Sequence, residues 1–305
     1  MTASRGTQPN LNRKAAAELQ MRRLPAGYRR SGIALALGGG FSRGFAHLGV
    51  LEVLEQEQIP ISLIVGTSIG GLLGAAFADG ISLRDLCDLG RHVRLRDFLR
   101  FRPSEQGAQR KDRLGQFVHE WFRSTEVEDL PIPSAIVTTD LDTGAPYVFT
   151  SGPLEVAIRA SCAFPGLLKP VEYKGRLLAD GCIAAPVPTA IAARINGGGV
   201  VGVSVGPNAA SVSSSQNVVK VFDTGFRAAH RNALEPSWAR HADILIEPQV
   251  QQIDWNDFSR VDEAFSAGAE AMRRALLPLR ELLARRSQLA PAPGMSLHTE
   301  RGLAL

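Results

Sequence analysis

Residues 32–78 read GIALALGGGFSRGFAHLGVLEVLEQEQIPISLIVGTSIGGLLGAAFA. The apolar run 33–37 ends in three glycines, which is typical of a buried strand that leads into a loop. Residues 44–58 carry apolar side chains at helical spacing, and Pro60 marks the end of that helix. A second apolar run, 61–65, and a second helical segment, 69–78, repeat the order. This alternation predicts parallel strands joined by right-handed crossovers.

The remainder of the chain extends this pattern. We expect mostly helical structure over 83–122, a helix over 154–161 and another over 218–233, and a long helix over 261–286. We expect strands at 134–139, 146–150, 171–173, 176–179, 200–205 and 244–247. The predicted fold is therefore α/β, with three layers in the order α/β/α around a mainly parallel central sheet.

Length and composition predict one main domain. The chain has 305 residues, of which 45% are hydrophobic, and this is ample for one sizeable core. We expect a basic, weakly ordered leader over 1–30, a catalytic domain over 31–290 and a loose tail over 291–305. No apolar run approaches the roughly 18 residues needed to cross a bilayer, and the leader lacks the apolar core of a secretory signal.

The net charge and the cysteine content limit the binding partners and the cellular compartment that we expect for this protein. Cys87, Cys162 and Cys182 stand far apart, which argues against a disulfide framework or a zinc site and favours a reducing cytoplasm. The net charge of +4 suits contact with anionic lipid at the inner membrane face. An arginine-rich codon usage explains that charge equally well. We expect no nucleic-acid partner, and the oligomeric state stays open.

A glycine-rich loop, Gly38-Gly39-Gly40-Phe41-Ser42-Arg43-Gly44, lies between the first strand and the first helix. Glycines let the backbone approach a ligand, and the unpaired N–H groups of a helix start attract an anion. That anion is either a phosphate or the oxyanion of an acyl-transfer intermediate. The loop lacks the Gly-Lys-Ser/Thr of a Walker A motif and the spacing of a dinucleotide fingerprint. A plain tight turn explains the loop equally well.

The segment Gly66-Thr67-Ser68-Ile69-Gly70 fits the pattern G-x-S-x-G between a strand and a helix. In that setting the serine sits on a strained turn with its hydroxyl exposed above the sheet, and the next N–H is an oxyanion donor. This context favours Ser68 as a nucleophile, with Ile69 supplying the N–H, over a chance match in a glycine-rich chain.

A serine nucleophile needs a base. In a triad with the chain order serine, acid, histidine, the eligible histidines are His230, His241 and His298, but none stands in a short strand-to-loop setting with a clear acid before it. His47 is expected to lie on a face of the first helix. The alternative base is Asp180, which ends a strand and is followed by Gly181. It needs partial desolvation to act near neutral pH, and an Asp-Gly pair is ordinarily only a turn.

Taken in order, the glycine-rich loop, the serine turn and Asp180-Gly181 resemble the motifs of the patatin-like phospholipases, particularly the bacterial serine esterases and lysophospholipases. Residues 159–166 also resemble a segment that bacterial members carry before the aspartate. The resemblance implies a Ser68–Asp180 dyad that acts on lipid esters or phospholipids through an acyl-enzyme, without metal or cofactor.

The resemblance also implies roles for the glycine-rich loop. The N–H groups of Gly39 and Gly40 would form the oxyanion hole, and Arg43 would fix the loop or meet a phosphate. Two positions depart from the family pattern. Cys182 replaces a glycine or alanine, and Phe41 replaces a small residue and is expected to narrow the acyl entrance.

The predicted activity is that of a serine lipid acyl hydrolase, meaning a phospholipase A, a lysophospholipase or a carboxylesterase. The alternatives are a non-catalytic lipid-binding or regulatory protein on the same fold, and an acyltransferase. Asp142-Thr143-Gly144 and Asp223-Thr224-Gly225 both match the aspartic protease signature. The first falls at a hairpin turn and the second in a helical stretch, so we do not expect a protease.

Overall fold

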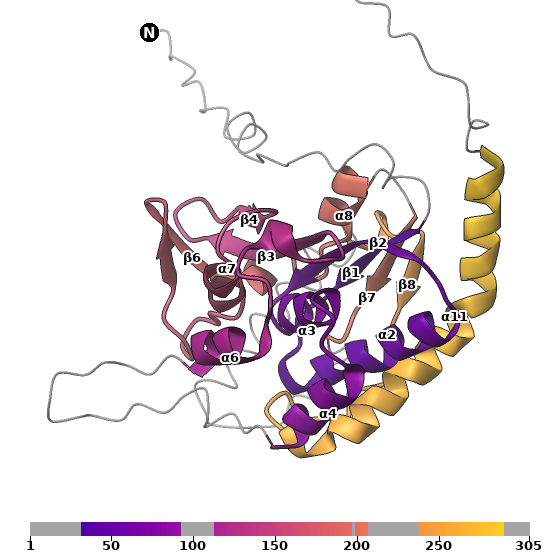
Figure 1. Cartoon of the computed structure of the whole chain (residues 1–305), viewed down its shortest axis with the longest axis horizontal. Coiled ribbons are helices and arrows are strands. Elements are labelled where there is room, and N and C mark those ends of the chain that lie inside the picture. Colours follow the sequence, from indigo (N-terminus) through magenta and orange to yellow (C-terminus); the bar gives the residue numbers. More distant parts are fainter. Residues whose placement is uncertain (1–31, 93–112, 197–198, 207–237, 290–305) are drawn as a thin grey trace, which may run out of the picture.

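The computed structural model describes residues 32–92, 113–196, 199–206 and 238–289. The expected leader, the tail, the helix over 218–233 and the second Asp-Thr-Gly segment lie outside these residues. Within them, elements follow one another as the alternating pattern predicts, and the chain forms a layered α/β structure (Figure 1).

The centre of the structure is one sheet, with the strand order β5-β6-β3-β2-β1-β7-β8 and β4 paired to β3. Neighbours from β3 to β8 along this order are parallel, whereas β4, β5 and β6 pair in antiparallel fashion. The prediction of a mainly parallel sheet is confirmed. The strands are β1 (Ile33–Leu37), β2 (Ile61–Thr67), β3 (Ser134–Asp140), β4 (Pro146–Phe149), β5 (Val171–Tyr173), β6 (Arg176–Asp180), β7 (Val200–Val203) and β8 (Ile244–Ile246).

Helices cover both faces of the sheet, which makes the three layers (Figure 1). In β1, Ile33, Leu35 and Leu37 belong to the larger core, while Ala34 and Ala36 belong to a smaller core on the opposite face. Burial on both faces explains why this strand is apolar at every position. The larger core packs against α2 (Ala46–Gln56), α3 (Ile69–Ala78), α4 (Leu83–His92), α6 (Arg113–Trp121), α7 (Leu154–Ser161) and α11 (Val261–Leu289).

The smaller core packs against α8 (Thr189–Asn196), a helix that the sequence analysis did not assign. A helix of about two turns shows too few apolar repeats for its period to stand out.

The first helix also differs from its expected bounds, because it begins as a 3₁₀ turn, η2 (Phe41–Phe45), before α2. Phe41 has a φ of 51°, so a regular α-helix cannot start at that residue.

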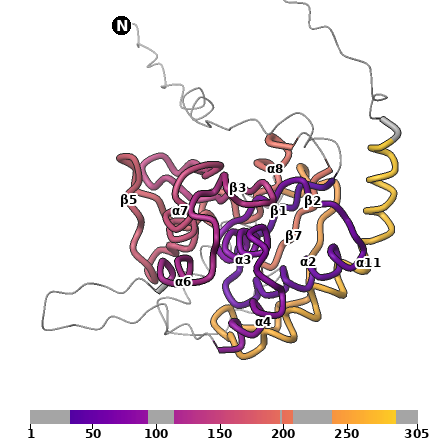
Figure 2. The backbone as a smooth tube through the Cα atoms, in the orientation of Figure 1, coloured from indigo at the N-terminus to yellow at the C-terminus, as the bar shows by residue number. Residues whose placement is uncertain are grey.

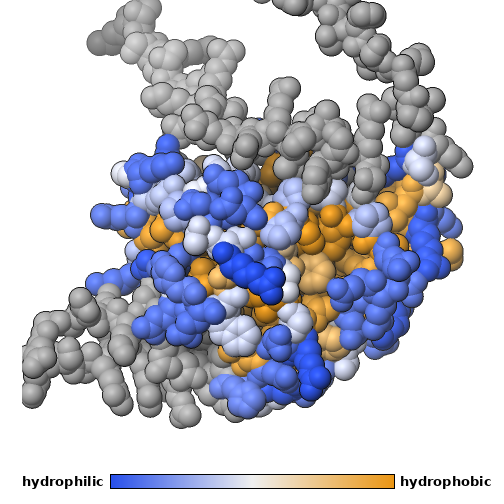
Figure 3. Space-filling model, in the orientation of Figure 1, coloured by the Kyte–Doolittle hydropathy of each residue, from blue (hydrophilic) through white to orange (hydrophobic). Residues whose placement is uncertain are grey.

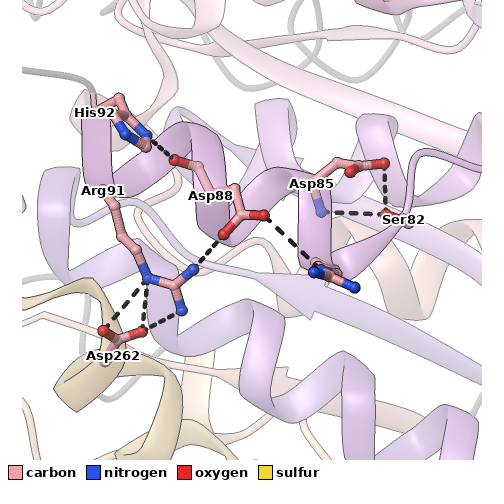
Figure 4. Close-up of polar contacts among 7 residues, drawn as sticks. Ser82, Asp85, Asp88, Arg91, His92 and Asp262 are labelled. Carbon is pink, nitrogen blue, oxygen red and sulfur yellow. Dashed lines mark hydrogen bonds and ion pairs between the residues drawn. The ribbon is translucent and has the colours of Figure 1, made fainter.

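The long helix α11 lies along α2, and Figure 2 shows it changing direction in its C-terminal part. Pro278 lies inside the helix and lacks the N–H that would continue the helical bonding, which accounts for a bend. At the other end of α11, Arg91 of α4 bonds Asp262 through Nε and Nη2, and its Nη1 also meets Asp88 (Figure 4). This exposed ion-pair cluster links α4 to α11.

The surface is mostly hydrophilic at its rim, and hydrophobic residues gather in the middle of the face drawn in Figure 3, toward α11. On α11 itself, Leu277 is 71% exposed. Among the described residues, no helix has the length and apolar character needed to span a bilayer.

Candidate active site

Ser68 occupies a sharp turn between β2 and α3. Its φ is 54° and its ψ −124°, a strained conformation for a residue with a side chain. The turn is tight enough that a Cβ on Gly66 would collide with the backbone of Gly70 and Gly71, so a glycine is required there. The side chain of Ser68 is buried, with 6% of the residue exposed.

Asp180 reaches the same place because of the sheet topology. β3 runs parallel to β2, and Val137 of β3 pairs with Thr67 at the end of β2. β3 then continues beyond that level, and β6 returns along it in the antiparallel direction, with Asp180 opposite Thr138. The last residue of β6 therefore stops beside the end of β2. The sheet pairing alone brings residues 68 and 180 together.

The two side chains are in direct contact. Ser68 Oγ donates to Asp180 Oδ2 at 2.7 Å, and no imidazole of the described residues lies between them. The other carboxylate oxygen, Oδ1, accepts the N–H of Cys182 at 2.8 Å. Asp180 is fully buried. Burial raises the pKa of this carboxyl to about 6, even though bonds from Cys182 and Ser68 favour the ionised form.

The glycine-rich loop lies beside this pair but differs in one detail from expectation. The N–H of Gly38 donates to Val203 O, and the N–H of Gly39 donates to Pro186 O, both at 3.0 Å. Gly39 was expected to be an oxyanion donor, and in this structure its N–H is already taken. The N–H of Gly40 meets no backbone acceptor within the described ranges. Ile69, at the first position of α3, has an N–H with no intrahelical acceptor.

His47 helps to hold the peptide unit between Gly38 and Gly39 in place, a role that the sequence pattern did not indicate. Its Nε2 lies 2.7 Å from Gly38 O. A carbonyl only accepts, so Nε2 carries the proton. Burial lowers the pKa of His47 to about 4, against the effect of the Gly38 bond. The peptide unit between Gly38 and Gly39 is thus held at its C=O by His47 and at its N–H by Pro186. A histidine in a helical apolar pattern carried no local signal of this contact.

Arg43 holds the loop from the other side. Its guanidinium Nε donates to Ile253 O at 2.7 Å, and the residue is buried. The hydroxyl of Ser42 lies 2.9 Å from the carbonyls of both Asp254 and Trp255. Through this bond Arg43 connects the glycine-rich loop to the segment that contains Ile253. Gly44, the last residue of the motif, packs against Ile69 at the start of α3.

Aromatic and thiol side chains surround the pair. The ring of Phe41 makes edge-on contacts with Phe164 and Trp255, at centroid distances of 5.2 and 5.0 Å. The thiol of Cys162 lies within bonding reach of Ser68, and its pKa is raised by burial and by Asp180. Cys182 fills the space beside Gly39, where a Cβ on that glycine would collide with its sulfur.

A further residue that the sequence analysis did not single out is Ser161, at the end of α7. Its Oγ accepts the N–H of Ser68 at 2.8 Å and donates to Val137 O at 2.7 Å.

The other residues that the sequence offered as catalytic candidates lie away from this pair or outside the described residues. Asp142 of the first Asp-Thr-Gly segment is exposed at a turn, and so is His241. His230 and His298 lie outside the described residues.

The comparisons with known proteins identify the class to which this fold and site belong. The family model described as patatin-like phospholipase matches residues 35–193, more than half of the chain. The chain belongs to the patatin-like phospholipase family, whose members generally hydrolyse lipids. The match includes the glycine-rich loop, Ser68 and Asp180.

Among relatives, the chain is 39% identical over 176 residues to an uncharacterized NTE family protein of Mycobacterium tuberculosis, which covers 57% of this chain and 49% of that protein. It is 33% identical over 182 residues to human patatin-like phospholipase domain-containing protein 6, covering 57% of this chain and 13% of that protein. The chain therefore matches about half the length of the mycobacterial relative. The crystal structure of VipD from Legionella pneumophila aligns with a TM-score of 0.48 at 14% identity, over 92% of this chain and 72% of that chain.

Proposed function

We propose that this chain is a serine-type lipid acyl hydrolase in which Ser68 is the nucleophile and Asp180 is the general base. The observation that carries the proposal is the 2.7 Å hydrogen bond from Ser68 Oγ to a fully buried carboxylate. A buried carboxylate with a pKa of about 6 is ionised at neutral pH and is still basic enough to accept a proton during attack.

The reaction would proceed through an acyl-enzyme. Ser68 Oγ attacks the ester carbonyl while its proton moves to Asp180 Oδ2. The N–H groups of Gly40 and Ile69 would stabilise the resulting oxyanion. The protonated Asp180 then gives its proton to the leaving alkoxide, and the C–O bond breaks. A water molecule that gives its proton to Asp180 attacks the acyl carbon, the bond to Ser68 Oγ breaks as Asp180 returns that proton to Oγ, and the fatty acid is released.

The substrate class follows from the family and from the surroundings of the pair. The apolar rings of Phe41, Phe164 and Trp255 suit an acyl chain better than a polar ester. Lysophospholipids, phospholipids and simple carboxylic esters are the proposed substrates. A peripheral contact with a membrane surface, which would deliver such substrates, forms part of the same proposal.

The test uses purified full-length protein with a p-nitrophenyl ester, lysophosphatidylcholine and phosphatidylcholine. Ser68→Ala and Asp180→Asn should lower kcat by at least roughly 10²–10⁴-fold. Ser62→Ala and Asp140→Asn are matched controls, since both residues are buried at other positions of β2 and β3, and they should retain hydrolysis. Hydrolysis that survives both Ser68→Ala and Asp180→Asn would refute the mechanism.

Two further measurements separate the alternatives. A fluorophosphonate probe should label Ser68 in the parent protein and not in Ser68→Ala. An absence of labelling would favour a lipid-binding protein without catalysis. Product analysis in the presence of an added alcohol distinguishes hydrolysis, which releases free fatty acid, from acyl transfer, which gives a new ester.

A further inference from the structure

Residues 161–163, at and just after the end of α7, contact both members of the proposed pair. The Oγ of Ser161 accepts the N–H of Ser68 at 2.8 Å. Two residues later, Ala163 O accepts the N–H of Asp180 at 3.0 Å. One short segment thus contacts the backbone of both residues, which are 112 positions apart in the chain.

The hydroxyl of Ser161 has its orientation determined by its partners. A serine hydroxyl has one proton and two lone pairs. The proton goes to Val137 O at 2.7 Å, so a lone pair is left to face the N–H of Ser68. Ser161 is fully buried, and water therefore cannot exchange with either partner. This bridge joins β3, α7 and the turn after β2.

The N–H of Ser68 needs such a partner. Ser68 lies in a strained conformation with a positive φ, and strained residues persist only where their surroundings determine them. Its N–H lies at the buried junction of strand and helix, outside the ladder bonds of β2 and the internal bonds of α3. An unpaired N–H in that position would carry the full penalty of desolvation.

We infer that Ser161 is a positioning residue that holds the Ser68 turn in its reactive geometry. The inference rests on the proposed function. A Ser–Asp pair lacks the third group that orients the base in a triad. Here the nucleophile itself is oriented, through its own N–H, by the hydroxyl of Ser161 at the end of α7, which is in turn bonded to Val137 O of β3. Ser161 touches neither the substrate nor the proton that moves.

This role differs from that of an ordinary buried hydroxyl. Ser62 provides the comparison, because it is also buried and lies near the other end of β2. Its hydroxyl lies 3.0 Å from Ile33 O and 3.3 Å from Asn196 Oδ1, and it can donate its one proton to only one of them at a time. Loss of either hydroxyl removes buried hydrogen bonds. Only the loss at position 161 releases the N–H of the nucleophile.

The experiment compares Ser161→Ala with Ser62→Ala in the full chain. We expect Ser161→Ala to lower kcat by roughly 10–100-fold, as for one lost buried bond at the reacting group. KM should change by less than about twofold, since substrate binding is untouched. The acid limb of the pH profile should keep its midpoint, because Ser161 does not contact the carboxylate of Asp180. Ser62→Ala should retain kcat.

A second measurement is independent of activity. Amide hydrogen exchange of a peptide that covers residues 66–71 should become about tenfold faster or more in Ser161→Ala, and not in Ser62→Ala. If kcat and exchange in Ser161→Ala match those of Ser62→Ala, the inference is wrong. If the parent protein shows no hydrolysis that depends on Ser68, the proposed function fails, and the exchange rate alone still decides whether Ser161 holds the turn.

Discussion

Replacing Asp180 by asparagine is expected to stabilise the folded protein at neutral pH while it abolishes activity. Burial raises the pKa of Asp180 from its ordinary 3.8 to about 6. Each pKa unit corresponds to about 1.4 kcal/mol, so the ionised carboxylate costs the folded state up to about 3 kcal/mol. Asparagine has a similar shape, carries no charge and can still accept the N–H of Cys182.

The pH dependence of this gain has a definite sign. Between about pH 4 and 6 the folded protein retains a proton on Asp180 that the unfolded chain has released, so the free energy of unfolding falls as pH rises. Below about pH 4 both states are protonated and the cost vanishes. The free energy of unfolding of Asp180→Asn should therefore equal that of the parent near pH 4 and exceed it by about 1–3 kcal/mol above pH 7. The gain is smaller than the full cost of the buried charge because the substitution weakens the bond from Ser68.

Urea unfolding at about pH 4, 5, 6 and 7.5 measures this difference. Asp140→Asn is the control, since Asp140 is buried too. Burial raises the pKa of Asp140, but the bond from Arg176 and two backbone N–H groups outweigh it and lower the pKa overall. That variant should lose stability at neutral pH. The reasoning is refuted if Asp180→Asn is less stable than the parent at pH 7.5, or if the difference is the same at every pH.

Three other outcomes are expected. The kcat/KM of the parent should fall about tenfold per pH unit below a midpoint near 6, the pKa of Asp180; a constant value down to about pH 5 would exclude this carboxyl as the base. Gly39→Ala should cost about 1–3 kcal/mol because its Cβ would collide with the sulfur of Cys182, and adding Cys182→Ala should restore part of that loss in denaturant titrations; no recovery would contradict the packing argument. Burial lowers the pKa of His47 to about 4, so between about pH 6.5 and 4 the unfolded chain binds a proton that the folded protein does not, and the free energy of unfolding decreases as pH falls through that window. His47→Gln should remove that part of the loss of stability at acid pH. Thermal unfolding at about pH 6.5 and at about pH 4 measures this loss, and a loss in the variant as large as in the parent would argue against the role given to His47.

Local sequence was sufficient wherever a structural element depends on its own residues. The run Ile33–Leu37 is apolar throughout because both faces of the strand are buried. Gly66 of the G-x-S-x-G turn is required for a local reason, because a Cβ there would collide with Gly70 and Gly71, whereas a Cβ on Gly70 would collide with the backbone of Leu37 and Gly38, which are distant in sequence. The short helix 189–196 escaped prediction because its period is too brief to detect. The 3₁₀ start of the first helix followed from the backbone of Phe41, which no pattern of side chains reveals.

What the sequence determined by itself is the set of chemical groups and their order along the chain: a glycine-rich loop, a serine on a sharp turn and an aspartate at a strand end. Only the tertiary structure decided how those groups are paired. The return of β6 along β3 brings Asp180 to Ser68, burial raises its pKa, and Ser161 and His47 orient the two loops. The physical reason is that these effects depend on contacts between residues that are distant in sequence and on the exclusion of water, and neither is encoded at any single position.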